Sequence, residues 1–191
     1  MRFLVATNNT HKFREIRELM PDKFELVNQI EFNIPSPKET GLTFIENALI
    51  KARHASIKSG LPAIADDSGL AVEALGGKPG IYSSRFGGPT ATDNQNTQKL
   101  LKEMEGKDNR TACFHCVVVL VRNEFDPVPL VTQGILKGEI LITPKGKEGF
   151  GYDSIFFLPD IKKTVAELPI HEKNKLSHRA EALRQLTRMI Q

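Results

Sequence analysis

The sequence predicts an α/β fold with a mixed β-sheet. In the first half of the chain, amphipathic segments with helical spacing alternate with apolar, strand-like segments. In the second half, long strand-like segments follow one another directly and can form hairpins. Alternating strands and helices favour parallel pairing, whereas consecutive strands favour antiparallel pairing, so both kinds are expected in one sheet. The length of 191 residues fits a single domain over residues 1–191.

Each expected element has its own local signal. Thr43 and Glu46 form a capping box, the following apolar residues share one helical face, and Gly60 ends that helix. Ser177 is a candidate N-cap for a closing helix. Helices are therefore expected over 11–20, 43–58, 93–105 and 177–190. Strands are expected over 2–6, 24–29, 61–65, 69–75, 111–123, 128–136, 138–142 and 154–158.

Composition and charge indicate which classes of protein are favoured. The net charge of +3 comes from scattered lysines and arginines, so no nucleic-acid partner is favoured. The apolar runs are far shorter than the ~20 residues of a membrane span, and the first residues lack the apolar core of a signal peptide. We therefore expect a cytoplasmic protein with no membrane partner. Cys113 and Cys116 lie in a β-branched run, where they should face opposite sides of a strand instead of forming a redox or zinc pair.

A first candidate site lies between the first strand and the first helix. Such a loop presents unpaired N–H groups and the positive end of the helix dipole, which suit phosphate, and a lysine adds a full charge. The alternative is an Asn- and Thr-rich loop that only caps the helix. The residues concerned are Thr7, Asn8, Asn9, Thr10, His11 and Lys12.

A second candidate site is acidic. Asp66 and Asp67 follow an apolar strand, and Gly69 permits a close turn after them. Adjacent carboxylates are costly unless a cation offsets them, and oxygen ligands of this kind suit Mg²⁺. Glu39 completes the acidic cluster if it lies nearby, and Lys51 alone is typical of a solvated lysine. An acidic turn without a metal remains the alternative.

A third set of candidates combines an aromatic residue with cations. Phe150 stands between two glycines and can lie flat against a base. Lys173, His178 and Arg179 lie near the predicted start of the closing helix, where cations oppose the dipole and therefore indicate a function. The sequence contains neither a P-loop nor a G-x-G-x-x-G after a strand, so neither of those nucleotide folds is expected.

Taken together, these segments resemble the inosine triphosphate pyrophosphatase (ITPase) family, in particular its bacterial dITP/XTP pyrophosphatases. The matching stretches are 6–12, 39–47, 65–70, 79–85, 149–153 and 177–179, in order over nearly the whole chain. Ser154, where the family usually has proline, and Lys147-Glu148, in place of small residues, depart from the pattern. The resemblance implies an elongated mixed sheet flanked by helices, two lobes with a central cleft, and a homodimer.

The resemblance also implies an activity and roles for residues. The expected enzyme is a Mg²⁺-dependent hydrolase that converts dITP, ITP and XTP to the monophosphate and pyrophosphate. Asp67 is expected to be the proton acceptor and, with Asp66 and Glu39, a metal ligand. Residues 7–12 are expected to hold the triphosphate, and Lys51 and Ser68 to contact phosphate or metal-bound water. The expected base-pocket residues are Phe150, Gly151, Tyr152, Asp153, Lys173, His178 and Arg179.

Three other interpretations stay open at this point. A non-catalytic nucleotide-binding module would have little use for a costly acidic cluster beside phosphates. A nucleic-acid-binding protein would need clustered cations and exposed aromatics, and the chain has no Trp and two Tyr. A related enzyme with a different base preference is separated only by substrate profiling.

Overall fold

The computed structural model describes residues 1–190, which form a seven-stranded sheet in the order β2-β1-β3-β4-β5-β6-β7. No helix within residues 1–190 is both long and apolar enough to span a membrane. The strands are β1 (Arg2–Val5), β2 (Glu25–Asn28), β3 (Ala63–Val72), β4 (Thr111–Val121), β5 (Leu130–Ile140), β6 (Phe156–Leu158) and β7 (Lys163–Thr164).

The helices lie between these strands and at the carboxyl end. The α-helices are α1 (Thr10–Leu19), α2 (Phe44–Ser59), α3 (Asp93–Glu103), α4 (Ile170–Leu176) and α5 (His178–Ile190). Short 3₁₀ helices are η1 (Gln29–Phe32), η2 (Glu73–Leu75), η3 (Gly80–Arg85), η4 (Pro159–Ile161) and η5 (Val165–Glu167).

The chain forms two compact units. Unit 1 comprises residues 1–67, 116–134 and those from 178 on, and unit 2 comprises residues 68–115 and 135–177. β3, β4 and β5 each have residues in both units. The prediction of a single domain over residues 1–191, with two lobes and a cleft, stays a prediction.

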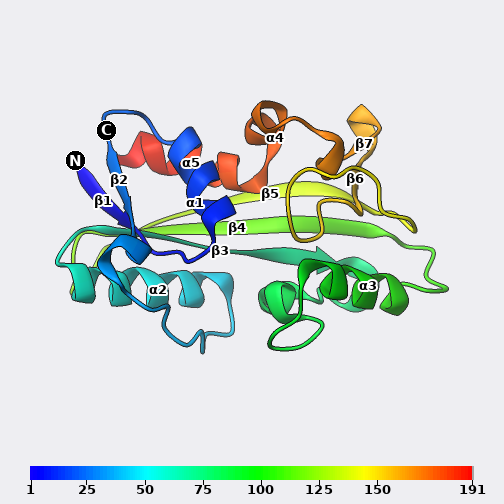
Figure 1. The fold of residues 1–191 in the computed structure, drawn as a ribbon, viewed down its shortest axis with the longest axis horizontal. Coiled ribbons are helices and arrows are strands. Elements are labelled where there is room, and N and C mark those ends of the chain that lie inside the picture. The colour runs from blue at the N-terminus through cyan, green and yellow to red at the C-terminus, as the bar shows by residue number, and fades with distance from the viewer. Residues whose placement is uncertain (191) are drawn as a thin grey trace. The chain divides into compact units, whose positions relative to one another are not determined.

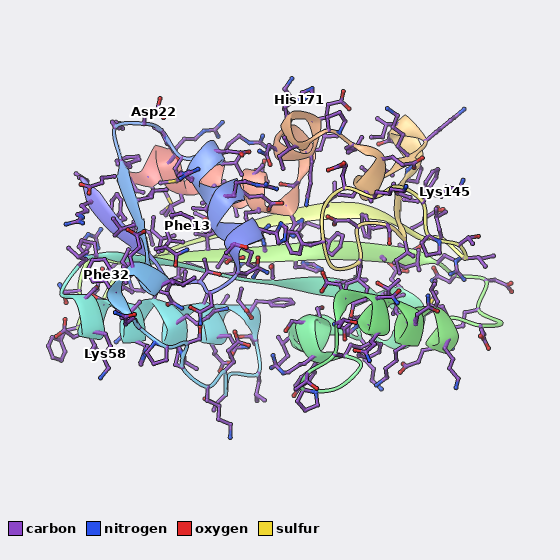
Figure 2. The ribbon with its side chains drawn as sticks, in the orientation of Figure 1. Phe13, Asp22, Phe32, Lys58, Lys145 and His171 are labelled. Carbon is purple, nitrogen blue, oxygen red and sulfur yellow. The ribbon has the colours of Figure 1, made fainter. Side chains whose placement is uncertain are left out.

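In unit 1, β1 pairs in parallel with β2 and β3, and helices cover both faces of these strands (Figure 1). Alternate residues of β1 point to opposite faces, as a strand requires. On one face, Phe3 and Val5 pack with Ile16 of α1 and Leu183 of α5. Lys58 of α2 is among the exposed side chains labelled in Figure 2.

The other face of β1 packs against α2. Leu4 and Ala6 meet a row of alanines that includes Ala48, Ala52 and Ala55. These three alanines are fully buried, and their small side chains let the helix lie close to the strands. Polar side chains of α2 that face the same strands are therefore held at short range from β3.

Unit 2 has antiparallel pairing of β5 with β6 and of β6 with β7. Its core contains Leu100 of α3, Met104 directly after that helix, Phe114 of β4 and Phe156 of β6. The two phenylalanine rings lie 4.4 Å apart between centroids. The predicted mixed sheet is confirmed, because parallel pairs occur in unit 1 and antiparallel pairs in unit 2.

The helix limits follow the predicted signals closely. Thr43 accepts from the backbone N–H of Glu46, the Glu46 carboxylate accepts from the N–H of Thr43, and Gly60 ends α2 at φ 68°. The closing helix begins at His178, directly after Ser177. α4 and β7 are additional elements that the sequence patterns did not predict.

Two strands differ from the prediction because each is longer than expected. Residues 63–65 and 69–72 of the two segments expected over 61–65 and 69–75 form one strand, β3, which continues through Asp66, Asp67 and Gly69 without a turn. The prediction was wrong for residues 73–75, which form the 3₁₀ helix η2. Most of the segments 128–136 and 138–142 likewise forms one strand, β5, with Gly138 inside it. A side chain at Gly138 would collide with the neighbouring strand β6, so this glycine permits close approach of a strand instead of ending one.

The two cysteines lie on β4, as predicted, and both are free thiols. Cys116 is buried in the core of unit 1, and this burial raises its pKa to about 12. A thiol with so high a pKa is a poor nucleophile and metal ligand, which agrees with a structural role.

Candidate functional site

The loop after β1 leads directly into α1. Asn9 caps the helix, since its side-chain oxygen accepts from the backbone N–H of His11 at 2.9 Å and of Lys12 at 3.1 Å. Thr7 is buried, and its hydroxyl oxygen accepts from the N–H of Asn9 at 3.1 Å. The first turn of α1 contains no acidic residue, so the positive end of its dipole is not offset there.

Asn8 links this loop to the segment after β2. Its side-chain oxygen accepts from Gln29 Nε2 at 2.7 Å, and its Nδ2 donates to Ser36 Oγ at 3.0 Å. Gln29 also donates to Ser36 at 3.0 Å and is 1% exposed. This network fixes the shape of the loop. The predicted capping occurs, and phosphate binding by the loop stays a prediction.

Asp66 lies in β3 and binds two cations. Its Oδ2 atom accepts from Lys12 Nζ at 3.0 Å and from Arg179 Nη2 at 3.0 Å and Nε at 3.3 Å. Arg179 Nη1 also donates to a carboxylate oxygen of Glu15 on α1. We call these four residues the Asp66 group. It holds two positive and two negative charges.

These contacts keep Asp66 ionised. Burial alone would raise the pKa of its carboxyl group, but Lys12 and Arg179 lower that pKa far below its usual range. Burial also opposes the charge of Arg179, while Asp66 and Glu15 raise its pKa and keep the guanidinium charged. The positive and negative charges of the Asp66 group are therefore equal in number.

Asp67, the next residue, belongs to a different set. Lys51 of α2 places Nζ 2.7 Å from Asp67 Oδ1 and 3.0 Å from Glu39 Oε1. We call these three residues the Asp67 group. Two carboxylates share one ammonium, so the group carries one negative charge in excess. Burial raises the pKa of Asp67 although Lys51 opposes this shift.

The segment that carries Glu39 is held against α2. The backbone N–H of Gly41 donates to Asn47 Oδ1 at 2.9 Å, and Asn47 is fully buried. A Cβ atom on Gly41 would come within 2.8 Å of that same Asn47 oxygen, so only glycine fits without a shift. Asn47 and Lys51 are one helical turn apart, so one face of α2 positions both Glu39 and its partner.

The donor set of the Asp67 group fits a divalent cation better than that of Asp66. Within residues 1–190, no three His, Cys, Asp or Glu side chains are arranged to hold a metal ion by themselves. Mg²⁺ is commonly bound through one or two carboxylates together with substrate phosphates, which Glu39 and Asp67 can provide. The Oδ2 atom of Asp66 is instead engaged by Lys12 and Arg179.

In unit 2, a tight turn organises the predicted base-pocket residues. Asp153 Oδ2 accepts from the backbone N–H of Phe150 at 3.0 Å and from Lys173 Nζ at 2.8 Å. The Lys173 ammonium also lies 4.7 Å from the centroid of the Phe150 ring. Gly149 has φ 81°, and a side chain there would collide with Asp153. Glycine is thus required for the turn that holds the ring beside the cation.

This turn lines a pocket of about 290 Å³ within unit 2. The pocket wall includes Phe150, Lys147 and Glu148, together with Asp93 of α3, whose carboxylate accepts from the N–H of Gly151 at 2.7 Å. Tyr152 is buried instead, and its hydroxyl donates to the carbonyl oxygen of Ser83 at 2.8 Å. The pocket is of the size that suits small ligands.

A family model described as the Ham1 family matches residues 3–189 of the chain. The chain belongs to the Ham1 family. A dITP/XTP pyrophosphatase of Coxiella burnetii is 48% identical over 193 residues, which cover 100% of this chain and 96% of the relative. A dITP/XTP pyrophosphatase of Photobacterium profundum is 52% identical, with 97% and 95% covered. The solved structure of a HAM1 protein from C. burnetii has a TM-score of 0.93 at 48% identity, with 100% and 98% covered.

These comparisons confirm the resemblance that the sequence indicated, and the fold class with it. In this Ham1-family chain, unit 1 brings together most of the predicted phosphate and metal residues: Thr7, Lys12, Glu39, Lys51, Asp66 and Asp67. Unit 2 brings together Phe150, Gly151, Asp153 and Lys173, while Ser68 lies in its part of β3. The roles assigned to all of these residues stay predictions, as do those of His178 and Arg179 in unit 1.

The sequence patterns missed two residues of this Ham1-family site. Glu15 is 3% exposed and bound to Arg179. Its position three residues after Lys12 places both on one face of α1, and that spacing is the signal that could have found it. Asp93, the first residue of α3, holds Gly151, and only the structure reveals this contact across 58 positions of sequence.

Proposed function

We propose that this chain is a dITP/XTP pyrophosphatase, which hydrolyses deaminated purine nucleoside triphosphates to the monophosphate and pyrophosphate. The observation that carries this proposal is the Asp67 group, in which a buried carboxylate with a raised pKa lies beside Glu39 and Lys51. The names of the relatives in the Ham1 family support the choice of substrates.

Asp67 is the proposed proton acceptor. A water molecule attacks the α-phosphorus, the bond from that phosphorus to the bridging oxygen breaks, and pyrophosphate leaves. Asp67 takes the proton from the attacking water, for which a base with a raised pKa is suited. Lys51 holds the carboxylates of Asp67 and Glu39 in place at 2.7 and 3.0 Å.

Glu39 and Asp67 are also the proposed ligands of Mg²⁺, because together they carry more negative charge than Lys51 neutralises. When bound, the metal ion would supply charge neutralisation for the phosphate oxygens. Asp66, the third expected metal ligand, stays a prediction; Lys12 and Arg179 bind its Oδ2 atom.

The triphosphate is proposed to bind at the amino end of α1. The backbone N–H groups and dipole at that end favour an anion, and Lys12 contributes an ammonium group with a partly exposed side chain. Ser68 stays a predicted phosphate contact.

For the base, the support comes from the pocket of unit 2. The exposed part of the Phe150 ring can stack on a purine, and Lys173 is a fixed donor beside it. Hypoxanthine and xanthine carry an acceptor oxygen at position 6, whereas adenine carries a donor there. A buried donor left facing an amine can cost about 10⁴-fold in discrimination. His178 and Arg179 stay predicted base contacts, and a homodimer in the cytoplasm stays the expectation from sequence.

The test is pyrophosphate release from ITP, XTP, GTP and ATP with Mg²⁺, by the wild type and Asp67→Asn. The wild type should hydrolyse ITP and XTP far faster than ATP and GTP. Asp67→Asn should lose about 10³-fold in kcat, the usual contribution of a general base. Asp22→Asn, the same change at an exposed aspartate after α1, is the matched control and should keep full activity.

Failure of the wild type to release pyrophosphate from any of the four nucleotides would refute the proposed activity and favour a nucleotide-binding module. Wild-type activity that survives in Asp67→Asn would leave the reaction intact but remove Asp67 from its proposed role.

A further inference from the structure

A buried arginine joins three separate parts of unit 1. Arg179 at the start of α5 is 1% exposed, and its guanidinium contacts Glu15 on α1 and Asp66 on β3. Since burial of an unbalanced charge is costly, this arginine requires both carboxylates to remain in place.

The same contacts lead from Glu15 to the lysine at the amino end of α1. Asp66 Oδ2 accepts from both Arg179 and Lys12, so one oxygen atom is shared by two cations. The position of the Lys12 ammonium thus depends on how Arg179 holds Asp66. Glu15 accepts from a different guanidinium nitrogen, Nη1, and its carboxylate neutralises part of the charge of Arg179.

Neutralising Glu15 would change this balance without touching Lys12 directly. Arg179 would then have Asp66 as the partner for its whole charge, and would compete more strongly with Lys12 for the shared oxygen. Glu15 is 3% exposed and does not reach solvent as an ordinary helix carboxylate does. Because burial of a carboxylate is costly, the charge of Glu15 does more than keep the helix soluble.

We infer that Glu15 is a positioning residue, which acts through Arg179 and Asp66 to set the place of the Lys12 ammonium for triphosphate binding. The inference rests on the proposed function, because it assigns Lys12 to the triphosphate of the substrate. It gives Arg179 a role in phosphate binding that does not require contact with the base.

The first test compares Glu15→Gln with the wild type in ITP hydrolysis. Lys12 binds the triphosphate before and during the reaction, so KM should rise about tenfold while kcat stays within about threefold. Glu18→Gln, an exposed glutamate on the same helix, is the matched control and should leave both constants unchanged. An unchanged KM in a folded Glu15→Gln protein would overturn the inference.

A double-mutant cycle asks whether Glu15 acts through Lys12. If it does, adding Glu15→Gln to Lys12→Ala should change KM by less than about twofold, because the group being positioned has already been removed. Multiplied effects of the two changes would show that Glu15 acts by another route and would overturn the inference.

Binding of inorganic tripolyphosphate, measured by calorimetry, separates this inference from the proposed function. The probe has no base, so a base contact of Arg179 cannot contribute, and it requires no turnover. Glu15→Gln should weaken its binding about tenfold even if the wild type hydrolyses no nucleotide. Equal affinity for both proteins would refute the inference, whereas absent hydrolysis alone refutes only the proposed activity.

Circular dichroism checks that each variant is folded. If Glu15→Gln is not, the test passes to Glu15→Leu/Arg179→Met, which removes both members of the Glu15–Arg179 pair and leaves Lys12 as the cation on Asp66 Oδ2, so that the ammonium is again held differently. This double variant should likewise bind tripolyphosphate about tenfold more weakly. Wild-type affinity in the folded double variant would overturn the inference.

Discussion

Asp66 and Asp67 are neighbours in β3, and both are buried, yet their surroundings differ. The Asp66 group has equal numbers of positive and negative charges, whereas the Asp67 group has two carboxylates for one lysine. The pKa of Asp66 is lowered and that of Asp67 is raised. Carboxylates whose environments push their pKa values apart are suited to different tasks.

The comparison indicates which aspartate holds the structure and which is available for chemistry. Asp66 joins α1, β3 and α5 through ion pairs within unit 1. Asp67 remains in a set with excess negative charge, where a further cation is favourable. Two predictions test this difference and a third extends it to another buried aspartate, from the largest expected effect to the smallest.

The largest effect is expected on stability when Asp66 is changed. Asp66→Asn leaves the buried guanidinium of Arg179 with Glu15 as its one carboxylate partner in the Asp66 group. The free energy of unfolding should fall by about 3 kcal/mol, as for other broken buried ion pairs. Urea denaturation monitored by circular dichroism measures it.

The matched control is the same change one residue later. Asp67→Asn keeps Glu39 beside Lys51 and removes a carboxylate that was in excess, so its stability should lie within about 1 kcal/mol of the wild type. A loss in Asp67→Asn equal to that in Asp66→Asn would contradict the division of the two aspartates.

The next effect concerns added Mg²⁺. At ten times its dissociation constant, a ligand stabilises the folded protein by about 1.4 kcal/mol, which raises the Tm of a protein of this size by about 3–5 °C. The wild type should show this shift, and Glu39→Gln and Asp67→Asn should lose it. Differential scanning calorimetry with and without Mg²⁺ measures the shift.

Asp66→Asn should keep the Mg²⁺-dependent shift, although its Tm is lower at the start. If instead Asp66→Asn abolished the shift while Glu39→Gln retained it, the metal would have to be assigned to the other side of β3.

The sequence predicted the elements whose signals are local. The ends of α2 are set by contacts within a few residues, which involve Thr43, Glu46 and Gly60, and the structure confirms both predicted ends. α4 was missed because it is short and its polar sequence has no apolar period. The predicted strand 61–65 also ended before Asp66, because two adjacent charged side chains normally interrupt a buried strand.

Because of that error, the sequence analysis did not predict that Asp66 and Asp67 have different surroundings. Adjacent residues of a strand face opposite sides, so a continuous β3 would have predicted two carboxylates in different surroundings. The strand continues because Lys12, Lys51 and Arg179 neutralise the charges, and these cations come from three helices distant in sequence. Such partners are set by the tertiary structure, which residue patterns do not specify.

The smallest effect extends the comparison to a third buried aspartate. Asp126 accepts from the backbone N–H groups of Arg122 at 2.9 Å and Val128 at 3.0 Å, and these bonds lower its pKa. Because the folded pKa is the lower one, its contribution to stability is present above pH ~4, the unfolded pKa, and is lost as the pH falls through the folded pKa. Asp126→Asn should therefore be less stable than the wild type by at most about 1 kcal/mol at pH 7, and the difference should shrink below pH ~4. Urea denaturation at pH 7 and pH 3 measures both values, and a difference that stayed constant with pH would show that the charge of Asp126 contributes nothing.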